Sequence, residues 1–269
     1  MKKVAFLLLF SFTVASGFAQ TDSCLTVPRT ETEIKTLSVL WQQHAAEYRA
    51  LCYQAFNIAA LRLFQIPKKE FKKTKFAIVT DLDETILDNS YAIAQQIKEN
   101  KEFVSSVDFK EWAKHAEATA VPGAVEFLQY AKSKGIAIFY ISNRDTGDLA
   151  STLINLKKLN LPDVDAAHML FRTNDFSKES RRKKVEADGY KIVLLLGDNL
   201  NDFTEAFENK NIADRFSETD KVKTEWGNKF IVLPNSTYGE WERILYVAED
   251  KTVCEKITKR KKLLIGYKK

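Results

Sequence analysis

Five short apolar segments, separated by stretches with helical periodicity, constrain the fold of this 269-residue chain more than any other feature. They are FAIVT (76–80), GIAIFYIS (135–142), AAHMLFR (166–172), KIVLLLGD (191–198) and KFIVLPN (229–235). Strands that are apolar throughout and alternate with helices are typical of a parallel sheet covered on both faces. The pattern therefore predicts an α/β fold with a doubly wound parallel sheet, over residues 70–245.

The other parts of the chain are predicted to add helices to this core. Residues 20–69 form an N-terminal helical segment that packs on the core, because apolar residues recur at three- and four-residue steps until Pro67. These residues are Leu37, Leu40, Trp41, Tyr48, Leu51, Tyr53, Phe56, Ile58 and Leu61. Residues 246–269 form a basic C-terminal segment, interpreted as a solvated tail.

The stretch between the first two strands is too long for a single crossover. Residues 89–121 are therefore predicted to be a small helical insert. Ligands of open α/β sheets bind outside the carboxyl ends of the strands. The insert begins just beyond such an end, so it is expected to cap the site.

The N-terminus, MKKVAFLLLFSFTVASGFAQ, has the features of a secretory signal. Two lysines precede an apolar run that is too short to span a membrane comfortably, and a small-x-small ending stops at Ala19. Residues 1–19 are expected to be a signal peptide, and the mature protein is expected in the periplasm or at the outer membrane. Cys24 leaves a lipid anchor open, although the residues before it lack the usual leucine-and-small-residue pattern.

Three cysteines follow the predicted cleavage site, so they cannot all pair within one chain. Cys52 lies on an apolar helical stretch and is expected to be a buried free thiol. Cys24 and Cys254 lie near the two ends of the chain, and a disulfide between them is left open.

Aspartates follow two of the predicted strands. Asp81 and Asp83 come after FAIVT, and Asp198 and Asp202 come after KIVLLLG in GDNLND. An Asp-x-Asp pair alone is weak evidence, because aspartate is common in turns. Strand ends of one polarity meet at one edge of a parallel sheet, however, so the two clusters are expected to converge there.

Crowded carboxylates repel one another and are costly to bury without a cation. With three histidines in the whole chain, a histidine-based metal centre is not expected. A set of carboxylate oxygens suits Mg²⁺, which usually shares its coordination shell with a substrate phosphate. The aspartates therefore indicate a magnesium site for phosphoryl chemistry.

Four motifs complete the pattern: Asp-x-Asp-x-Thr at Asp81, Asp83 and Thr85, Ser142 in YISNR, Lys178 in FSKESRRKK, and GDNLND. In this order they resemble the motifs of the haloacid dehalogenase-like superfamily, and specifically the class C acid phosphatases of the bacterial lipoprotein e type. The resemblance extends from EYRALCYQAFNIA through DLDETILDNS and AVPGAVEF to LPNSTYGEWE. It implies the haloacid dehalogenase-type core with a helical cap.

The resemblance also implies roles for the aspartates. Asp81 is the nucleophile that forms an aspartyl phosphate. Asp83 protonates the leaving oxygen and then takes a proton from water. Mg²⁺ is bound by the carboxylate of Asp81, the backbone carbonyl of Asp83, and Asp198. Asp202 orients Lys178 or supports the metal shell, and Thr85 has a supporting role.

Ser142 and Lys178 are implied to hold phosphoryl oxygens. From the residues alone, Ser142 could instead be a turn residue. Lys178 could belong to a solvated basic face with its neighbours Arg181 to Lys184. A lysine is electrostatically disfavoured at a helix start, which favours the anion-binding interpretation.

Three aromatic residues are hypothesised to contact the substrate. Tyr91 opens the insert, Trp112 lies within it, and Tyr238 lies three residues past the expected end of the last strand. Aromatic rings can stack on any nucleobase. The alternative is that these rings are packing residues.

These observations predict an exported, Mg²⁺-dependent acid phosphatase that hydrolyses phosphomonoesters, above all nucleoside 5′-monophosphates. A dehalogenase would not need the acid that Asp83 supplies, a phosphomutase would lack phosphorylated partners after export, and a binding protein would not need every motif. The net charge of +5 is too mild to indicate a nucleic-acid polymer as partner. A membrane contact is expected only through a lipid anchor, and a homodimer is left open.

Overall fold

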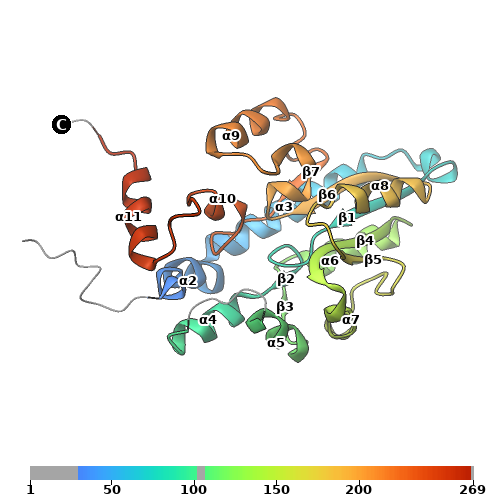
Figure 1. Cartoon of the computed structure of the whole chain (residues 1–269). Coiled ribbons are helices and arrows are strands. Elements are labelled where there is room, and N and C mark those ends of the chain that lie inside the picture. The colour runs from blue at the N-terminus through green and yellow to red at the C-terminus, as the bar shows by residue number, and fades with distance from the viewer. Residues whose placement is uncertain (1–29, 102–106, 268–269) are drawn as a thin grey trace, which may run out of the picture.

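The core of the protein is a five-stranded parallel sheet with strand order β5-β4-β1-β6-β7 (Figure 1). The computed structural model describes residues 30–101 and 107–267. The strands are β1 (Lys75–Thr80), β4 (Ala137–Asp145), β5 (Met169–Arg172), β6 (Tyr190–Gly197) and β7 (Phe230–Val232). The predicted α/β class and all five strands are confirmed.

Alternate residues of the central strand β1 enter two separate hydrophobic clusters. Phe76 and Ile78 pack with the cluster that contains helices α3 (Ala46–Phe64) and α6 (Ala124–Ser133). Ala77 and Val79 pack in the cluster on the other face, which includes Val185 of α8 (Glu179–Ala187). Both faces of β1 are therefore covered, which explains its apolar run from Phe76 to Val79 and makes the sheet doubly wound.

The boundaries of three strands differ from the prediction by two residues or more. β5 begins at Met169, three residues later than expected. β7 ends at Val232, three residues earlier than expected, and Pro234 follows without an N–H to donate to the ladder. β4 begins at Ala137, because the left-handed backbone of Gly135 (φ 79°) first turns the chain out of α6. It then runs on to Asp145, past the expected end at residue 142.

The N-terminal segment contains α1 (Glu31–Ile34), α2 (Thr36–His44) and α3. The buried face of α3 is formed by Tyr48, Cys52, Ala55, Phe56, Ala59 and Leu63. The predicted apolar set was therefore only partly right, because five of its nine residues are exposed: Leu37, Leu40, Leu51, Tyr53 and Leu61. Small residues and the cysteine take their places against α6, where a close helix contact leaves little room.

The insert between β1 and β4 contains helices α4 (Ser90–Lys98) and α5 (Val107–His115). Its two ends are joined by an unpredicted two-stranded antiparallel ladder of β2 (Leu87–Asp88) and β3 (Thr119–Ala120). In addition, the amide of Gln42 in α2 donates to Asp88 Oδ1 (2.7 Å). The base of the insert is thus fixed to both the core and the N-terminal helices.

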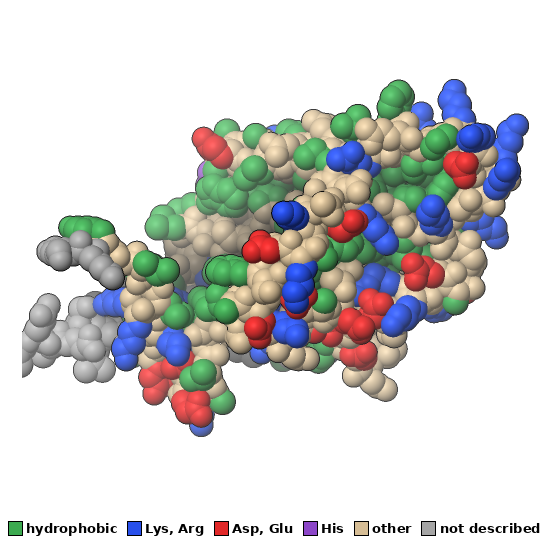
Figure 2. Space-filling view, turned by 90° about the horizontal axis from the view of Figure 1, so that it is seen from above, with side chains coloured by type: hydrophobic (Ala, Val, Ile, Leu, Met, Phe, Trp, Pro, Cys, Tyr) green, Lys and Arg blue, Asp and Glu red, His purple; other side chains and the backbone are tan. Residues whose placement is uncertain are grey.

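The remaining elements surround the sheet and its C-terminal side. They are α7 (Leu149–Lys158), α9 (Ile212–Lys221), α10 (Glu240–Arg243), α11 (Val253–Leu263) and the short 3₁₀ helices η1 (Lys68–Lys72), η2 (Thr146–Asp148), η3 (Leu200–Asp202) and η4 (Glu205–Phe207). The C-terminal segment is not only a solvated tail, because Arg260 of α11 forms an ion pair with Glu242 of α10 (3.1 Å). On the face shown in Figure 2, acidic and basic side chains are interspersed, with lysine and arginine densest at the right-hand end.

Cys52 is buried and free, as predicted, and Cys254 is disulfide-bonded. The predicted signal peptide lies outside the described residues. So does Cys24, and with it the lipid site and the disulfide to Cys254 that the sequence left open. Within the described residues, no helix combines the length and the hydropathy that crossing a membrane requires.

Candidate active site

Three aspartates meet at the carboxyl edge of the sheet. Asp81 directly follows β1, Asp198 follows β6, and Asp202 ends η3. One carboxylate oxygen from each lies within 4.8 Å of the others. The predicted convergence of the two aspartate clusters is therefore what the fold produces.

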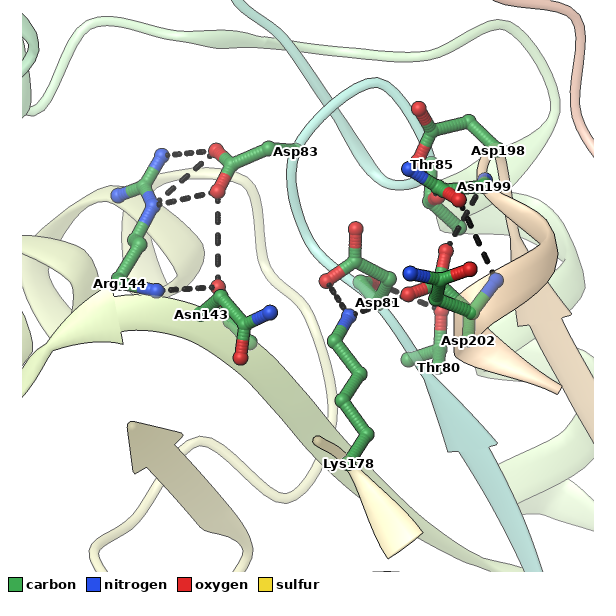
Figure 3. Close-up of polar contacts among 12 residues, drawn as sticks. Thr80, Asp81, Asp83, Thr85, Asn143, Arg144, Lys178, Asp198, Asn199 and Asp202 are labelled. Atoms are coloured by element: carbon green, nitrogen blue, oxygen red, sulfur yellow. Dashed lines mark hydrogen bonds and ion pairs between the residues drawn. The ribbon is translucent and has the colours of Figure 1, made fainter. Parts of the chain in front are cut away.

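Lys178 inserts into this group from the start of α8 (Figure 3). Its ammonium group contacts Asp81 Oδ1 and lies 2.7 Å from Asp202 Oδ1. Only 6% of its side chain is exposed. Burial lowers the pKa of Lys178, but the carboxylates of Asp202 and Asp81 outweigh burial and hold that pKa above the usual value. The lysine is therefore a permanent cation within the cluster.

One lysine does not compensate the three carboxylates. Burial raises the pKa of Asp81 well above its ordinary value; Lys178 opposes this rise, while Asp202 and Asp198 add to it. Burial, followed by the charge of Asp202, also raises the pKa of Asp198 to about 7. The donors are oxygens only, which is the chemistry that a hard divalent cation such as Mg²⁺ requires. The residues present thus fit the predicted metal.

The backbone around Asp202 is shaped for its side chain. A Cβ at Gly197, the last residue of β6, would overlap the carboxylate of Asp202. The same carboxylate accepts a hydrogen bond from the backbone N–H of Asn199 (3.0 Å). Glycine is therefore needed at position 197, because the side chain of Asp202 lies directly against its backbone.

Asp83 faces a different partner from Asp81, although only one residue separates them. Nε of Arg144 donates to both carboxylate oxygens of Asp83 (3.1 and 3.2 Å), and Nη2 donates to Oδ1 (2.7 Å). Asn89 Nδ2 also donates to Oδ1 (2.9 Å). Figure 3 shows the two carboxylates turned to different sides, Asp81 toward Lys178 and Asp83 toward Arg144.

The two predicted hydroxyl residues connect these groups. Ser142 in β4 is buried; its Oγ accepts a hydrogen bond from the backbone N–H of Arg144 (3.1 Å) and lies 3.5 Å from Asp83 Oδ2. Thr85 Oγ1 donates to Asp198 Oδ1 (3.2 Å), which links the first motif to the last.

A cavity of about 550 Å³ opens over these residues. Among the predicted site residues, its walls include Asp81, Asp83, Lys178, Asp198, Asp202 and Tyr238. The insert contributes Ala92, Ile93, Phe109 and Lys110. The insert therefore lies over the carboxyl edge of the sheet, as a cap would.

The three predicted aromatic residues are not brought together. Tyr238 lies in the cavity wall, and its hydroxyl donates to the buried carboxylate of Glu84. Tyr91 and Trp112 do not line the cavity; their rings stack on each other with centres 6.5 Å apart. Trp112 Nε1 donates instead to Asn89 Oδ1 (2.8 Å).

Sequence reasoning missed Arg144, Asn89 and Phe109. Side chains two residues apart in a strand point to the same side, so the position of Arg144 after Ser142 could have indicated it. Phe109 and Asn89 carry no comparable signal, because the fold of the insert alone decides which of its residues face the cavity.

A parallel α/β sheet that carries an aspartate pair after its central strand, a serine, a lysine and a second acidic loop on one edge defines a haloacid dehalogenase-type hydrolase. The model of the HAD superfamily, subfamily IIIB (acid phosphatase), matches residues 7–241, so the chain belongs to this family. It is an acid phosphatase that hydrolyses small phosphate esters.

Solved structures agree with this assignment. The class C acid phosphatase from Bacillus anthracis is 39% identical, with a TM-score of 0.81, over 88% of this chain and 99% of that one. The structure of the same enzyme with tungstate bound matches with the same identity, coverage and TM-score. The class C resemblance inferred from the motifs is thereby confirmed.

Proposed function

We propose that this acid phosphatase depends on Mg²⁺ and works through an aspartyl-phosphate intermediate. The observation that carries the proposal is the separate environment of the two aspartates. Asp81 lies in the carboxylate cluster with Lys178, whereas Asp83 lies across the cavity wall with Arg144. This difference supports attack by Asp81 and proton transfer by Asp83.

In the first half-reaction, a carboxylate oxygen of Asp81 forms a bond to phosphorus as the bond from phosphorus to the ester oxygen breaks. Asp83 gives its proton to that leaving oxygen. In the second half-reaction, Asp83 takes a proton from water, whose oxygen bonds to phosphorus and displaces Asp81. The products are an alcohol and inorganic phosphate.

The remaining residues bind and orient the phosphoryl group. Lys178 would donate to a phosphoryl oxygen while Asp202 keeps its ammonium in place. Ser142 would donate its hydroxyl to another. The tungstate complex of the Bacillus anthracis relative supports an oxyanion site, because tungstate is a tetrahedral oxyanion like phosphate.

Asp81, Asp198 and the backbone carbonyl of Asp83 would hold Mg²⁺, with Asp202 nearby. When bound, the cation would neutralise negative charge on the carboxylates and on the phosphoryl oxygens. The raised pKa values of Asp81 and Asp198 support this assignment, since both carboxylates need a further cation to ionise together.

We further propose that nucleoside 5′-monophosphates are preferred substrates, with Tyr238 as the stacking residue. Its place in the cavity wall supports this choice, whereas Tyr91 and Trp112 lack such support. Export to the periplasm or outer membrane is proposed from the N-terminal signal pattern alone.

One assay tests the reaction and its cofactor. Purified protein is given p-nitrophenyl phosphate, glycerol phosphate and nucleoside 5′-monophosphates, with Mg²⁺, with chelator, and with Mg²⁺ restored. Phosphate release that disappears with chelator and returns with Mg²⁺ is expected. Unchanged turnover after complete removal of divalent cations would contradict the metal dependence.

A further inference from the structure

Arg144 is held in one position by contacts with three elements. Only 2% of its side chain is exposed. Nε and Nη2 bind Asp83, and Nη1 donates to Thr152 Oγ1 in α7 (2.9 Å). The guanidinium also lies 5.2 Å from the ring centre of Phe109 in α5. Core and insert thus both fix the guanidinium, which leaves it little freedom to turn toward another partner.

The carboxylate of Asp83 is also held by Asn89, the first residue of the insert. Asn89 donates to Oδ1 of Asp83 (2.9 Å), and Asn89 is itself oriented by Trp112 (2.8 Å). The insert therefore contributes to the position of Asp83 twice, through Phe109 on Arg144 and through Trp112 on Asn89.

Arg144 and Lys178 contact different aspartates of the site. Burial lowers the pKa of Arg144, but Asp83 outweighs it and raises that pKa, with smaller contributions from Glu84 and Asp148. Lys178, in contrast, is held by Asp202 and Asp81. Arg144 is thus coupled to the proposed acid and base and not to the nucleophile.

We propose that Arg144 is a positioning residue for Asp83. Its fork fixes both carboxylate oxygens on the side of the cavity that the insert covers, so that Asp83 meets the ester oxygen and, later, the attacking water in one orientation. This inference rests on the proposed function, in which Asp83 exchanges protons with those oxygens.

The test compares substrates that differ in their need for an acid. p-Nitrophenolate leaves readily without protonation, whereas the alkoxide of glycerol phosphate does not. Arg144→Ala should lower kcat for glycerol phosphate at least about tenfold more than kcat for p-nitrophenyl phosphate. Arg144→Lys keeps the charge but loses the two-point grip, so it should shift the ratio in the same direction by less.

A double variant separates positioning from phosphate binding. In an Asp83→Asn background, Arg144→Ala should change the ratio of the two kcat values no further, because the residue it positions is already disabled. If Arg144 bound phosphoryl oxygens instead, Arg144→Ala would lower both kcat values alike and would do so again in that background. That result would overturn the inference.

The two proposals fail in different ways. If Asp83→Asn lost activity equally on both substrates, the acid role of Asp83 would be wrong. The positioning role of Arg144 would then be wrong as well. If Asp83→Asn were selective but Arg144→Ala and Arg144→Lys kept the wild-type ratio, only the positioning role would be overturned.

Folding is checked by circular dichroism and melting curves. Arg215→Lys is the matched control: Arg215 is equally buried but donates to Phe207 O (2.7 Å) and Asn201 Oδ1 (2.8 Å), away from Asp83. It should lower Tm without changing the kcat ratio. If Arg144→Ala does not fold, Arg144→Lys decides the question alone: a wild-type ratio in that variant overturns the inference.

Discussion

The surroundings of Asp81 and Asp83 differ in almost every respect, although both residues belong to one short loop after β1. Asp81 shares a buried cluster with two further carboxylates and has one lysine as its cation. Asp83 is bound by an arginine fork and an amide, and the 18% exposure of its side chain opens it to the cavity. Negative charge thus exceeds positive charge around Asp81, whereas Asp83 has Arg144 as its own cation.

The cause of this difference lies in the order of the strands. Asp81 continues β1, and its N–H donates to Leu196 O of β6 (2.9 Å), so its side chain meets the β6 loop. Arg144, the partner of Asp83, belongs to β4, which pairs with β1 on the side opposite to β6. The two carboxylates therefore differ in surroundings because their partners come from strands on opposite sides of β1.

The largest expected effect comes from removing the nucleophile. Asp81→Asn should lower kcat for every phosphomonoester by on the order of 10⁴-fold or more, because no other group can attack phosphorus from that position. Steady-state kinetics with aryl and alkyl phosphates would check this. A variant that kept turnover on either ester class would show that the two aspartates are not divided as proposed.

A smaller and selective loss of activity is expected from removing Asp83, the proposed acid and base. Asp83→Asn should reduce hydrolysis of alkyl phosphates by roughly 10²- to 10⁴-fold but spare p-nitrophenyl phosphate in part, since a good leaving group needs less protonation. The same kinetic comparison applies. Equal and complete loss on both esters would assign Asp83 to a step that every substrate shares.

Metal binding should depend on pH through the cluster of Asp81, Asp198 and Asp202. The pKa of Asp198 is raised to about 7, so below pH 7 a proton competes with the cation and Mg²⁺ affinity should fall by up to about tenfold per pH unit. Without metal, the stability linked to Asp198 is complete below its unfolded pKa and is lost as pH rises through about 7. Added Mg²⁺ should therefore raise Tm more at pH 7.5 than at pH 5.5.

Two variants sharpen this prediction. Asp198→Asn should weaken the pH dependence of the Mg²⁺-induced rise in Tm, leaving only the part that the raised pKa of Asp81 contributes, whereas Asp83→Asn should keep it. A rise that is independent of pH in the wild type would argue that Asp198 does not bind the cation.

The smallest effect is expected at the cavity wall. Tyr238→Ala should raise KM for nucleoside 5′-monophosphates about tenfold, on the order of 1.4 kcal/mol, and leave glycerol phosphate almost unchanged, because only the nucleotides carry a ring to stack. Tyr238→Phe keeps the ring and loses the hydrogen bond to Glu84, so it separates stacking from anchoring. Equal losses on all substrates with a lowered Tm would mark Tyr238 as a packing residue.

The sequence was sufficient for the parts of the molecule that depend on periodicity and strand polarity. All five strands of the sheet could be predicted, because residues such as Ile78 and Leu196 are buried within uninterrupted apolar runs. The meeting of Asp81 with Asp198 followed from the common edge of a parallel sheet. Of the boundaries that failed, the start of β4 and the end of β7 were decided by local backbone geometry at Gly135 and by Pro234.

Which aromatic residues of the insert face the cavity could not be predicted in the same way. Tyr91, Trp112 and Phe109 are all aromatic residues of the insert, and their order in the chain does not say which one turns inward. In the structure Phe109 covers Arg144, while Tyr91 and Trp112 stack on each other. That choice depends on how α5 packs against its neighbours, which is a property of the assembled fold.

The central place of β1 in the strand order has a consequence for how the protein folds. β1 pairs with β4 and β6, which come much later in the chain, and Lys178 reaches Asp81 across 97 positions. Chains dominated by such distant pairings have high contact order and fold slowly. We therefore expect the catalytic centre to form late, when β6 docks beside β1, so that neither a nascent chain nor a fragment ending before residue 198 has partial activity.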